Sequence, residues 1–349
     1  MTASLTFAYP GRLDLKTGGY GYDRRIVEGL KQLGWQVDLL SLGEGFPFPS
    51  AAQLAQAEAL LSALPDNALL MVDGLAYGVL DEWAQREGKR LRIVALVHHP
   101  LALESGLDEG QRQRFFASEV AALSCASGVV VTSKATAREL SESYDVEAGQ
   151  ITVALPGTDP ASLIPDRTPN RPPHILSVGS LIERKGHDVL LDALSRIADL
   201  DWSAAIIGSR DLDPATTKAL EQKIVALKLT ERVRLAGECG DVRSVMAHAD
   251  IFALASRYEG YGMVFAEALA EGLPIVACHA GAVPEVVPAA AGILVPADDA
   301  AAFADALRTL VSDRSERQTR AKASRLAGAA LPGWDETARV ISTRLEALQ

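Results

Sequence analysis

Short apolar runs alternate with amphipathic helical stretches along most of this 349-residue chain. The runs have no internal alternation of polar residues, which is typical of strands buried on both faces of a parallel sheet, with helices as crossovers. In the first half the runs are Leu5–Tyr9, Val37–Leu42, Leu69–Val72, Ile93–Val97, Val129–Thr132 and Ile151–Leu155. In the second half they are Ile175–Val178, Ala204–Ile207, Val233–Leu235, Ile251–Leu254, Ile275–Ala277 and Ile293–Val295. The pattern predicts doubly wound α/β structure in both halves.

The alternation is interrupted between residues 157 and 173, where prolines recur. A linker there would divide a chain that is too long for one ordinary core. We therefore expect two tandem Rossmann-like domains facing a cleft, at residues 1–160 and 170–330. The remaining residues, 331–349, are predicted to form a helix that packs back on the first domain. Ligands of such sheets bind beyond the carboxyl ends of the strands.

The overall charge is acidic, with a formal net charge of −11. This balance argues against nucleic acid or anionic lipid as a partner. The start of the chain lacks a basic region and a long apolar run, and no stretch reaches ~18 uninterrupted apolar residues. Cys125, Cys239 and Cys278 have neither metal nor disulfide spacing and are expected to be reduced, buried thiols. These features predict a cytoplasmic protein.

The densest pattern lies between Arg257 and Ala277 and reads as a strand end, a glycine turn, a helix and another strand. Gly260 and Gly262 would let backbone N–H groups approach a ligand, and the positive end of the following helix suits a phosphate. Glu259 and Glu267 could accept hydrogen bonds from sugar and ribose hydroxyls. The alternative is that Glu259 caps the helix and Glu267 is a solvated surface residue.

A second pattern follows the first run of the second half, where Arg184 and Lys185 stand together at the start of a helical stretch. Two adjacent cations there could neutralise a diphosphate leaving group. As surface cations they would oppose the helix dipole, so a role in binding is the favoured interpretation.

The stretch 257–277 resembles the E-x(7)-E region of glycosyltransferase family four, whose members are retaining enzymes of GT-B fold. The resemblance implies an N-terminal acceptor-binding domain and a C-terminal nucleotide-sugar-binding domain. It implies that Glu259 contacts the transferred sugar, that Glu267 binds the ribose, and that the Arg184–Lys185 pair neutralises the donor diphosphate. The other donor-binding positions that it implies in this stretch are Gly260, Tyr261, Gly262, Met263 and Val264.

The first half carries two weaker matches to the same family. Gly18 and Gly19 follow the first run, where a Gly-Gly pair in the family lines the cleft; a structural turn is the alternative. This is not the G-x-G-x-x-G fingerprint, because Arg24 occupies the third glycine position. The family has a histidine, often His-Asp, after a later strand. His98 takes that place and His99 replaces the Asp, so either could contact the sugar, or simply close the strand.

Two Asp-x-Asp triplets are candidates for metal ligands. They are Asp199-Leu-Asp201 and Asp211-Leu-Asp213. Both lie at predicted helix ends beside loops, so we interpret them as caps and solvated turns and expect no metal site.

Together these features predict a retaining, metal-independent hexosyltransferase that uses a nucleotide-diphosphate sugar and needs no other cofactor. Glu259 and His98 or His99 would stabilise the oxocarbenium-like sugar, while Arg184 and Lys185 hold the leaving diphosphate. A soluble small molecule or glycan is favoured over a membrane lipid as acceptor. One alternative is an epimerase or hydrolase of nucleotide sugars, which needs no acceptor. The other is a non-catalytic nucleotide-sugar-binding protein, which would not require Arg184, Lys185, Glu259 and Glu267 together.

Overall fold

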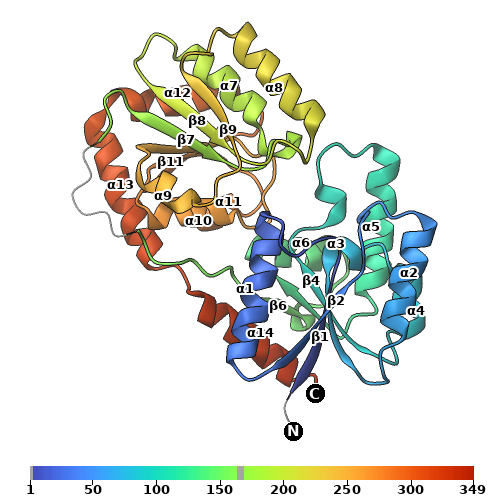
Figure 1. Cartoon of the computed structure of the whole chain (residues 1–349). Helices are drawn as coiled ribbons and strands as arrows, with labels where there is room; N and C mark the ends of the chain where they lie inside the picture. Colours follow the sequence, from blue (N-terminus) through green and yellow to red (C-terminus); the bar gives the residue numbers. More distant parts are fainter. Residues whose placement is uncertain (1–2, 163–168) are drawn as a thin grey trace. The chain divides into compact units, whose positions relative to one another are not determined.

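The computed structural model describes residues 3–162 and 169–349 (Figure 1). The chain divides into two compact units. The first unit comprises Met1–Gly157 and Pro332–Gln349, and the second comprises Thr158–Leu331. The C-terminal helix therefore belongs to the first unit, although the whole second unit separates it in sequence.

The first unit contains a six-stranded sheet with strand order β2-β1-β3-β4-β5-β6, in which every pairing is parallel. Its strands are β1 (Ser4–Tyr9), β2 (Gln36–Ser41), β3 (Leu69–Asp73), β4 (Arg92–Val97), β5 (Gly128–Val131) and β6 (Ile151–Val153). Its helices are α1 (Gly18–Gln32), α2 (Ala51–Ser62), α3 (Gly74–Tyr77), α4 (Asp81–Glu87), α5 (Glu109–Leu123), α6 (Lys134–Ser143) and α14 (Trp334–Glu346), with short 3₁₀ turns η1 (Leu101–Leu103) and η2 (Ala148–Gln150).

Helix α14 completes the first unit by packing on α1. The two helices approach so closely that a Cβ atom added to Gly29 would lie 2.6 Å from the Cβ of Ala338. The Trp35 indole donates a hydrogen bond to Ser342 Oγ at 2.9 Å, and Thr337 Oγ1 donates to the carbonyl of Leu155 at 2.7 Å. These contacts join the end of the chain to α1 and to the residues that follow β6.

The second unit repeats the architecture with strand order β12-β11-β10-β7-β8-β9, again with only parallel pairings. Its strands are β7 (His174–Val178), β8 (Ser203–Ile207), β9 (Val233–Gly237), β10 (Ile251–Leu254), β11 (Ile275–Cys278) and β12 (Gly292–Val295). Its helices are α7 (His187–Arg196), α8 (Pro214–Ala226), α9 (Val242–Ala247), α10 (Met263–Ala270), α11 (Val283–Val286), α12 (Ala300–Ser312) and α13 (Arg314–Ala329), with the 3₁₀ turn η3 (Glu183–Lys185) before α7.

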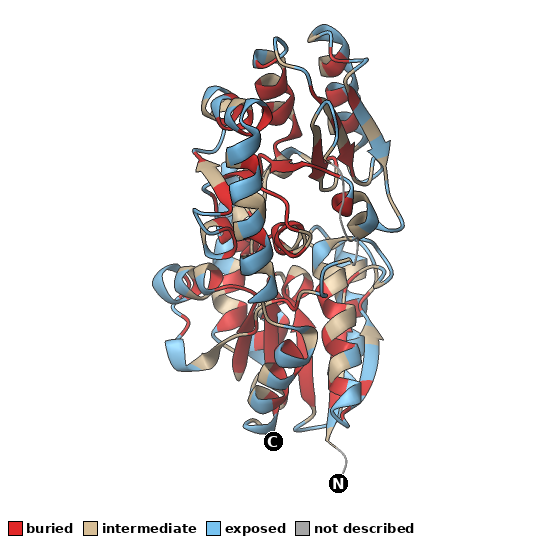
Figure 2. Cartoon of the chain, turned by 90° about the vertical axis from the view of Figure 1, so that its left-hand side faces the viewer, coloured by how far each residue is buried: buried red, intermediate tan, exposed pale blue. Residues whose placement is uncertain are grey.

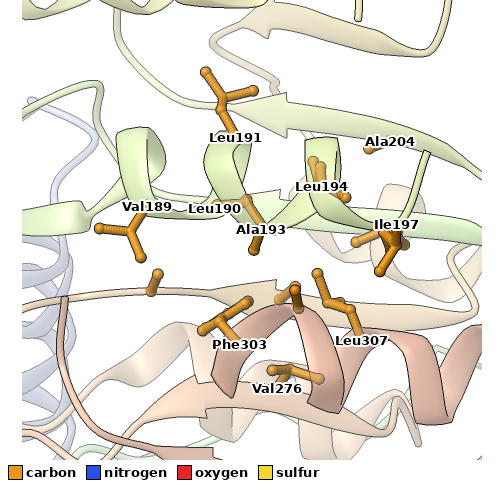
Figure 3. Packing of buried hydrophobic residues seen from close by; sticks show 14 of the residues in the cluster. Val189, Leu190, Leu191, Ala193, Leu194, Ile197, Ala204, Val276, Phe303 and Leu307 are labelled. Carbon is orange, nitrogen blue, oxygen red and sulfur yellow. The ribbon is translucent and has the colours of Figure 1, made fainter. Parts of the chain in front are cut away.

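Each unit has its own hydrophobic core between sheet and helices. Strands β3, β5, β10 and β11 are buried at every residue, as expected for central strands covered on both faces (Figure 2). In the second unit, Leu190 and Leu194 of α7 pack in one cluster with Phe303 and Leu307 of α12 (Figure 3). The predicted fold class, two tandem doubly wound domains, is confirmed.

Two smaller expectations have different outcomes. All three cysteines are free thiols, but only Cys278 is buried, so the prediction of buried thiols is wrong for Cys125 and Cys239, which are partly exposed. Among the described residues, no helix has both the length and the apolar character needed to cross a membrane.

Candidate functional site

In the second unit, Arg184 and Lys185 lie on η3, just beyond the carboxyl end of β7. The Lys185 ammonium is 2.6 Å from Glu259 Oε1, and the Arg184 guanidinium is 3.7 Å from Glu259 Oε2. Arg184 also donates a hydrogen bond to the carbonyl of Tyr258 at 3.0 Å. Because β7 and β10 are neighbours in the sheet, the loops that follow them meet at one edge. We call Arg184, Lys185 and Glu259 the cation–glutamate cluster.

Backbone geometry fixes this cluster in place. Gly186 ends η3 with a φ of 61°, and a Cβ at this position would overlap the carbonyl oxygen of Ala255. Gly281 packs in the same way against the backbone of Glu259, and the Ala282 amide donates to the Glu259 carbonyl at 2.9 Å. Glycine is required at both close approaches.

Glu259 is only 5% exposed, and its carboxylate also accepts a hydrogen bond from Ser256 Oγ at 2.6 Å. Burial alone would raise the pKa of Glu259, but the charges of Lys185 and Arg184 and the hydrogen bonds of Lys185 and Ser256 bring the pKa below its usual value. The carboxylate is therefore ionised, and the cluster carries one net positive charge. An oxygen-rich anion is the ligand that this charge favours.

Helix α10 begins directly after Gly262, which has a φ of 88° and gives the helix start no side-chain cap. The predicted donor-binding residues Gly260, Tyr261, Met263 and Val264 surround this turn. Burial raises the pKa of Tyr261 to about 12, so its hydroxyl stays protonated at neutral pH. Because no side chain caps α10, the backbone N–H groups of its first turn can donate hydrogen bonds to a ligand.

Glu267 lies on α10 and does not join the cation–glutamate cluster. The described residues form no hydrogen bond or ion pair with its carboxyl group, and the residue is partly buried. Burial raises its pKa to about 7; Arg243 lowers the pKa, while Asp159 and Glu271 raise it further. The alternative of a fully solvated Glu267 does not fit this environment, and Glu259 is not the cap of α10.

In the first unit, His98 follows β4, and its Nε2 atom lies 3.1 Å from Asp23 Oδ1 and 3.7 Å from Asp73 Oδ2. Asp23 belongs to α1 and Asp73 ends β3. The Tyr22 ring meets the imidazole edge-on at 5.4 Å, and the imidazole also lies against Gly19, where an added Cβ would be 3.4 Å from His98 Cδ2. We call Asp23, Asp73 and His98 the aspartate–histidine cluster.

Both carboxylates of this cluster are buried, whereas the His98 side chain keeps 21% of its surface exposed. Burial by itself lowers the pKa of His98, but the charges of Asp23 and Asp73 and the hydrogen bonds to them raise it to about 10. Burial and the charge of Asp73 raise the pKa of Asp23 to about 7. Burial opposes ionisation of Asp73 as well, yet hydrogen bonding and the charge of His98 lower its pKa. His98 is thus an imidazolium at neutral pH.

His99 points to different partners. Its Nε2 atom lies 3.1 Å from Glu104 Oε2, beside the turn η1. Of the paired glycines, Gly19 contacts the His98 ring, whereas Gly18 has open space around its Cα atom. Of the two candidate histidines, His98 joins Asp23 and Asp73, whereas His99 does not.

Asp23 and Asp73 are candidate site residues that the sequence interpretation missed. Asp73 follows the run Leu69–Val72, so the rule that ligands bind at carboxyl strand ends could have found it. Asp23 lies on the buried face of α1 between Tyr22 and Ile26, and a charged residue within an apolar helix face was the available signal.

Ligand atoms of the aspartate–histidine cluster lie within 4.8 Å of one another, a spacing that could hold a metal ion. The protonated state of His98 works against this, because a metal requires the imidazole lone pair. Of the Asp-x-Asp triplets, Asp213 caps α8 through the Thr216 amide at 2.9 Å, and Asp199 forms an ion pair with Arg308 at 2.7 Å.

Comparison with known proteins places these features in context. Residues 172–313 match the family model described as "Glycosyl transferases group 1". The chain is 28% identical over 260 residues to a D-inositol 3-phosphate glycosyltransferase of Corynebacterium efficiens, covering 67% of this chain and 61% of that protein. It is 29% identical over 176 residues to the lipopolysaccharide core biosynthesis mannosyltransferase LpsB of Rhizobium meliloti, covering 48% and 47%. These matches thus span about half to three-fifths of the length of the relatives.

Solved structures extend the likeness to the whole fold. A sucrose-phosphate synthase from Thermosynechococcus elongatus superposes with a TM-score of 0.82 at 21% identity, covering 98% of both chains. Anabaena Alr3699/HepE in complex with UDP-glucose gives a TM-score of 0.78 at 19% identity, covering 98% of this chain and 99% of that one. The two-domain architecture of this chain is that of GT-B glycosyltransferases.

Proposed function

We propose that this chain, whose residues 172–313 form a glycosyl transferases group 1 domain, moves a hexose-type sugar from a nucleotide-diphosphate sugar to an acceptor with retention of configuration. The observation that carries the proposal is the cation–glutamate cluster. Lys185 and Arg184 are held at the carboxyl edge of the sheet by one ionised carboxylate, 2.6 Å and 3.7 Å away. Such an arrangement is already organised for a diphosphate before the donor binds.

The two cations would act on the leaving group. When the bond between the anomeric carbon and the phosphate oxygen breaks, negative charge grows on the diphosphate. Charge-assisted hydrogen bonds from Arg184 and Lys185 become stronger as this charge develops, which stabilises the transition state more than the bound donor. No metal ion is needed for this neutralisation.

Glu259 would act on the other reacting part of the donor. Its carboxylate is ionised and adjacent to both cations, so a sugar attached to the bound diphosphate would lie near it. A fixed negative charge there stabilises the positive charge that develops on the sugar ring. In the proposed step the acceptor oxygen bonds to the anomeric carbon on the face that the diphosphate leaves, and the acceptor proton passes to the departing phosphate oxygen.

The aspartate–histidine cluster offers a second point of contact in the first unit. Asp23 and Asp73 both approach Nε2, so Nδ1 is the nitrogen of His98 left to meet a ligand. As an imidazolium, His98 would donate a hydrogen bond to a substrate oxygen and would not serve as a general base. This assigns His98 an electrostatic role and gives Asp23 and Asp73 the role of positioning it.

The names of the related proteins support the choice of donor and of reaction. Two relatives are called a D-inositol 3-phosphate glycosyltransferase and a mannosyltransferase, and a structural neighbour holds UDP-glucose. A nucleotide sugar is therefore the proposed partner of the second unit. For the acceptor we propose a soluble small molecule or glycan.

A two-stage experiment tests the proposal. First, thermal unfolding is measured with UDP-, GDP- and ADP-sugars; a true donor at 100 times its dissociation constant stabilises the fold by ~2.7 kcal/mol. Second, the donor found is incubated with a panel of polyol, sugar and sugar-phosphate acceptors, and the anomeric configuration of the product is read by NMR. An α-linked product from an α-linked donor supports the proposal.

The alternatives give different results in the same experiment. A hydrolase or epimerase consumes the donor without any acceptor, and a binding protein is stabilised by a donor that it never consumes. Either result would overturn the proposed transfer. Arg184→Ala and Lys185→Ala should each reduce turnover more than tenfold, the scale of one lost charge-assisted hydrogen bond, with Arg196→Ala on α7 as the matched control.

A further inference from the structure

The second unit also contains a pocket of about 470 Å³ that is separate from the cation–glutamate cluster. Arg171, Arg314 and Arg317 line it together with the proline-rich segment 169–173. We call it the arginine pocket. Its volume lies within the range of small-molecule sites.

The arginine pocket is at the opposite edge of the sheet from the candidate active site. The segment 169–173 leads into the amino end of β7, and Asp201, which also lines the pocket, precedes the amino end of β8. Arg184 and Glu259 follow the carboxyl ends of β7 and β10 instead. A ligand in this pocket would therefore not be the donor bound at the cation–glutamate cluster.

Arg317 is the buried cation of the pocket, with only 9% of its surface exposed. Its Nη1 atom donates to the carbonyls of Leu310 and Val311 near the end of α12. Its Nε and Nη2 atoms have no acceptor among the described residues, yet they are not among the buried unpaired nitrogens. Because Arg317 lines the pocket, these N–H groups are candidate donors to a ligand there.

The lining of the pocket carries more basic than acidic side chains. Within the described part of the chain, Arg171, Arg314 and Arg317 form no ion pair with a carboxylate, and Asp201 is the one acidic residue that lines the pocket. Three cations and one carboxylate thus line the pocket.

The position of Arg314 and Arg317 adds to this imbalance. Arg314 is the first residue of the 16-residue helix α13, where a cation opposes the helix dipole, although Asp313 caps this helix end. Burial lowers the pKa of Arg317, and the charge of Arg314 lowers it further, although Asp250 and Asp313 act in the opposite direction. An anion in the pocket would relieve both the repulsion between the arginines and their opposition to the helix dipole.

We propose that the arginine pocket binds the phosphate group of a small phosphorylated molecule. Arg314 and Arg317 supply N–H donors from the first turns of α13, and Arg171 supplies a third cation from the segment before β7. The prolines at 169, 172 and 173, which have no N–H group, and Val311 provide an apolar wall for the carbon part of the ligand. The proposal does not depend on the sugar-transfer activity.

The test is isothermal titration of the full chain with glucose 6-phosphate, inorganic phosphate and glucose. Glucose 6-phosphate should bind more tightly than phosphate, and glucose should not bind. Arg314→Gln and Arg171→Gln should each weaken binding of glucose 6-phosphate about tenfold. Arg325→Gln, on an exposed part of the same helix, is the matched control and should change the affinity less than about twofold. These variants leave the hydrogen bonds of Arg317 intact.

The double variant Arg184→Ala/Lys185→Ala separates this pocket from the candidate active site. Binding of glucose 6-phosphate should persist in it. Loss of binding in this double variant, or unchanged binding in Arg314→Gln and Arg171→Gln, would overturn the proposal. Equal affinity for glucose 6-phosphate and inorganic phosphate would overturn the assignment of the apolar wall. If the proposed transferase activity fails while the arginine variants weaken binding, the pocket stands and only the proposed function falls.

Discussion

Asp23 Oδ1 lies 3.1 Å from His98 Nε2, and the aspartate that makes this contact is fully buried. The second oxygen of Asp23 is also enclosed and has no hydrogen-bond partner among the described residues. A buried carboxyl group in this position needs a nearby positive charge, and the imidazolium provides it. The contact joins α1 to the end of β4 and fixes which nitrogen of His98 remains for a ligand.

The first prediction is that His98 stays doubly protonated across the neutral range. The pKa of His98 is raised to about 10, so its ¹⁵N resonances should titrate far above about pH 6.5. Asp23→Asn should lower that pKa, whereas Asp38→Asn on the exposed face of β2 should not. Titration of wild-type His98 near pH 6.5 would contradict the assignment. Because the folded-state pKa is the higher one, the stabilisation from His98 is complete below about pH 6.5 and is lost as the pH rises through about 10.

A second prediction concerns Glu119 of α5, which the proposed mechanism does not use. Burial raises its pKa to about 8, although the Leu101 amide donates a hydrogen bond to Oε2 at 2.9 Å and thereby lowers the pKa. The other oxygen, Oε1, is buried without a partner in the described part of the chain. Ionisation of this group is therefore unfavourable in the folded protein.

The raised pKa of the Glu119 carboxyl group determines how stability changes with pH. Its contribution to stability is present below about pH 4.5 and is lost as the pH rises through about 8. Glu119→Gln keeps an acceptor for Leu101 and should flatten the loss of unfolding free energy between these pH values. Glu109→Gln, on the exposed start of α5, serves as control. Denaturant unfolding at several pH values is the measurement, and identical profiles for Glu119→Gln and the wild type would refute the prediction.

Some of these sites follow from the sequence and others do not. Arg184 and Glu259 are 75 positions apart, yet both could be assigned to one sheet edge because each follows an apolar run and such runs end at a common edge. That Lys185 would lie 2.6 Å from Glu259 could not be predicted, since it depends on the left-handed turn at Gly186.

The aspartate–histidine cluster shows a second limit of sequence reasoning. His98 and His99 follow the same strand, and adjacent residues point in different directions, so the sequence alone left either one as the candidate. Which of them joins Asp23 depends on how α1 packs against the end of β4, and the sequence does not give this packing. A charged residue on an apolar helix face marks Asp23 as unusual, but nothing local in the sequence indicates that its partner is His98.

The third prediction tests the packing of the C-terminal helix on α1. Gly29→Ala would place a methyl group 2.6 Å from the Cβ of Ala338, so the two helices would have to separate. Overpacking of this kind costs ~1–3 kcal/mol of unfolding free energy. Gly18→Ala, at the start of the same helix with open space around it, should change stability by less than about 0.5 kcal/mol. Equal stability of the two variants in denaturant unfolding would show that α14 does not pack as described.

The fourth prediction is that sugar transfer survives excess EDTA. The cation–glutamate cluster supplies positive charge for the diphosphate, and a metal ion at His98 would have to displace the proton that the two aspartates stabilise. The measurement is the initial rate with and without chelator. Loss of activity that Mn²⁺ restores would make the aspartate–histidine cluster a metal site and would require a different account of the leaving group. The Asp-x-Asp residues would return as candidates only if variants of Asp23 and Asp73 left that metal dependence unchanged.

The last prediction separates the two glutamates of the E-x(7)-E stretch. Glu259 contacts both cations and is ionised, whereas Glu267 stands apart from them with a pKa raised by burial to about 7. If Glu259 stabilises charge that exists only in the transition state, Glu259→Gln should lower kcat more than tenfold with little change in donor KM. Because the neutral amide in the Glu259→Gln variant would no longer compete with the diphosphate for Lys185, donor affinity should not weaken.

If Glu267 binds ribose hydroxyls, it acts equally in the ground and transition states and should control donor affinity. Glu267→Gln should raise donor KM about tenfold, the scale of one hydrogen bond to a charged group, with little effect on kcat. The ionised carboxylate is the better acceptor, so wild-type donor affinity should weaken as the pH falls through about 7, and this dependence should disappear in Glu267→Gln. Binding measured by titration from about pH 6 to 8 decides the point. A pH-independent affinity in the wild type, or a loss of kcat in Glu267→Gln, would mean that the two roles are assigned wrongly even if the reaction is sugar transfer.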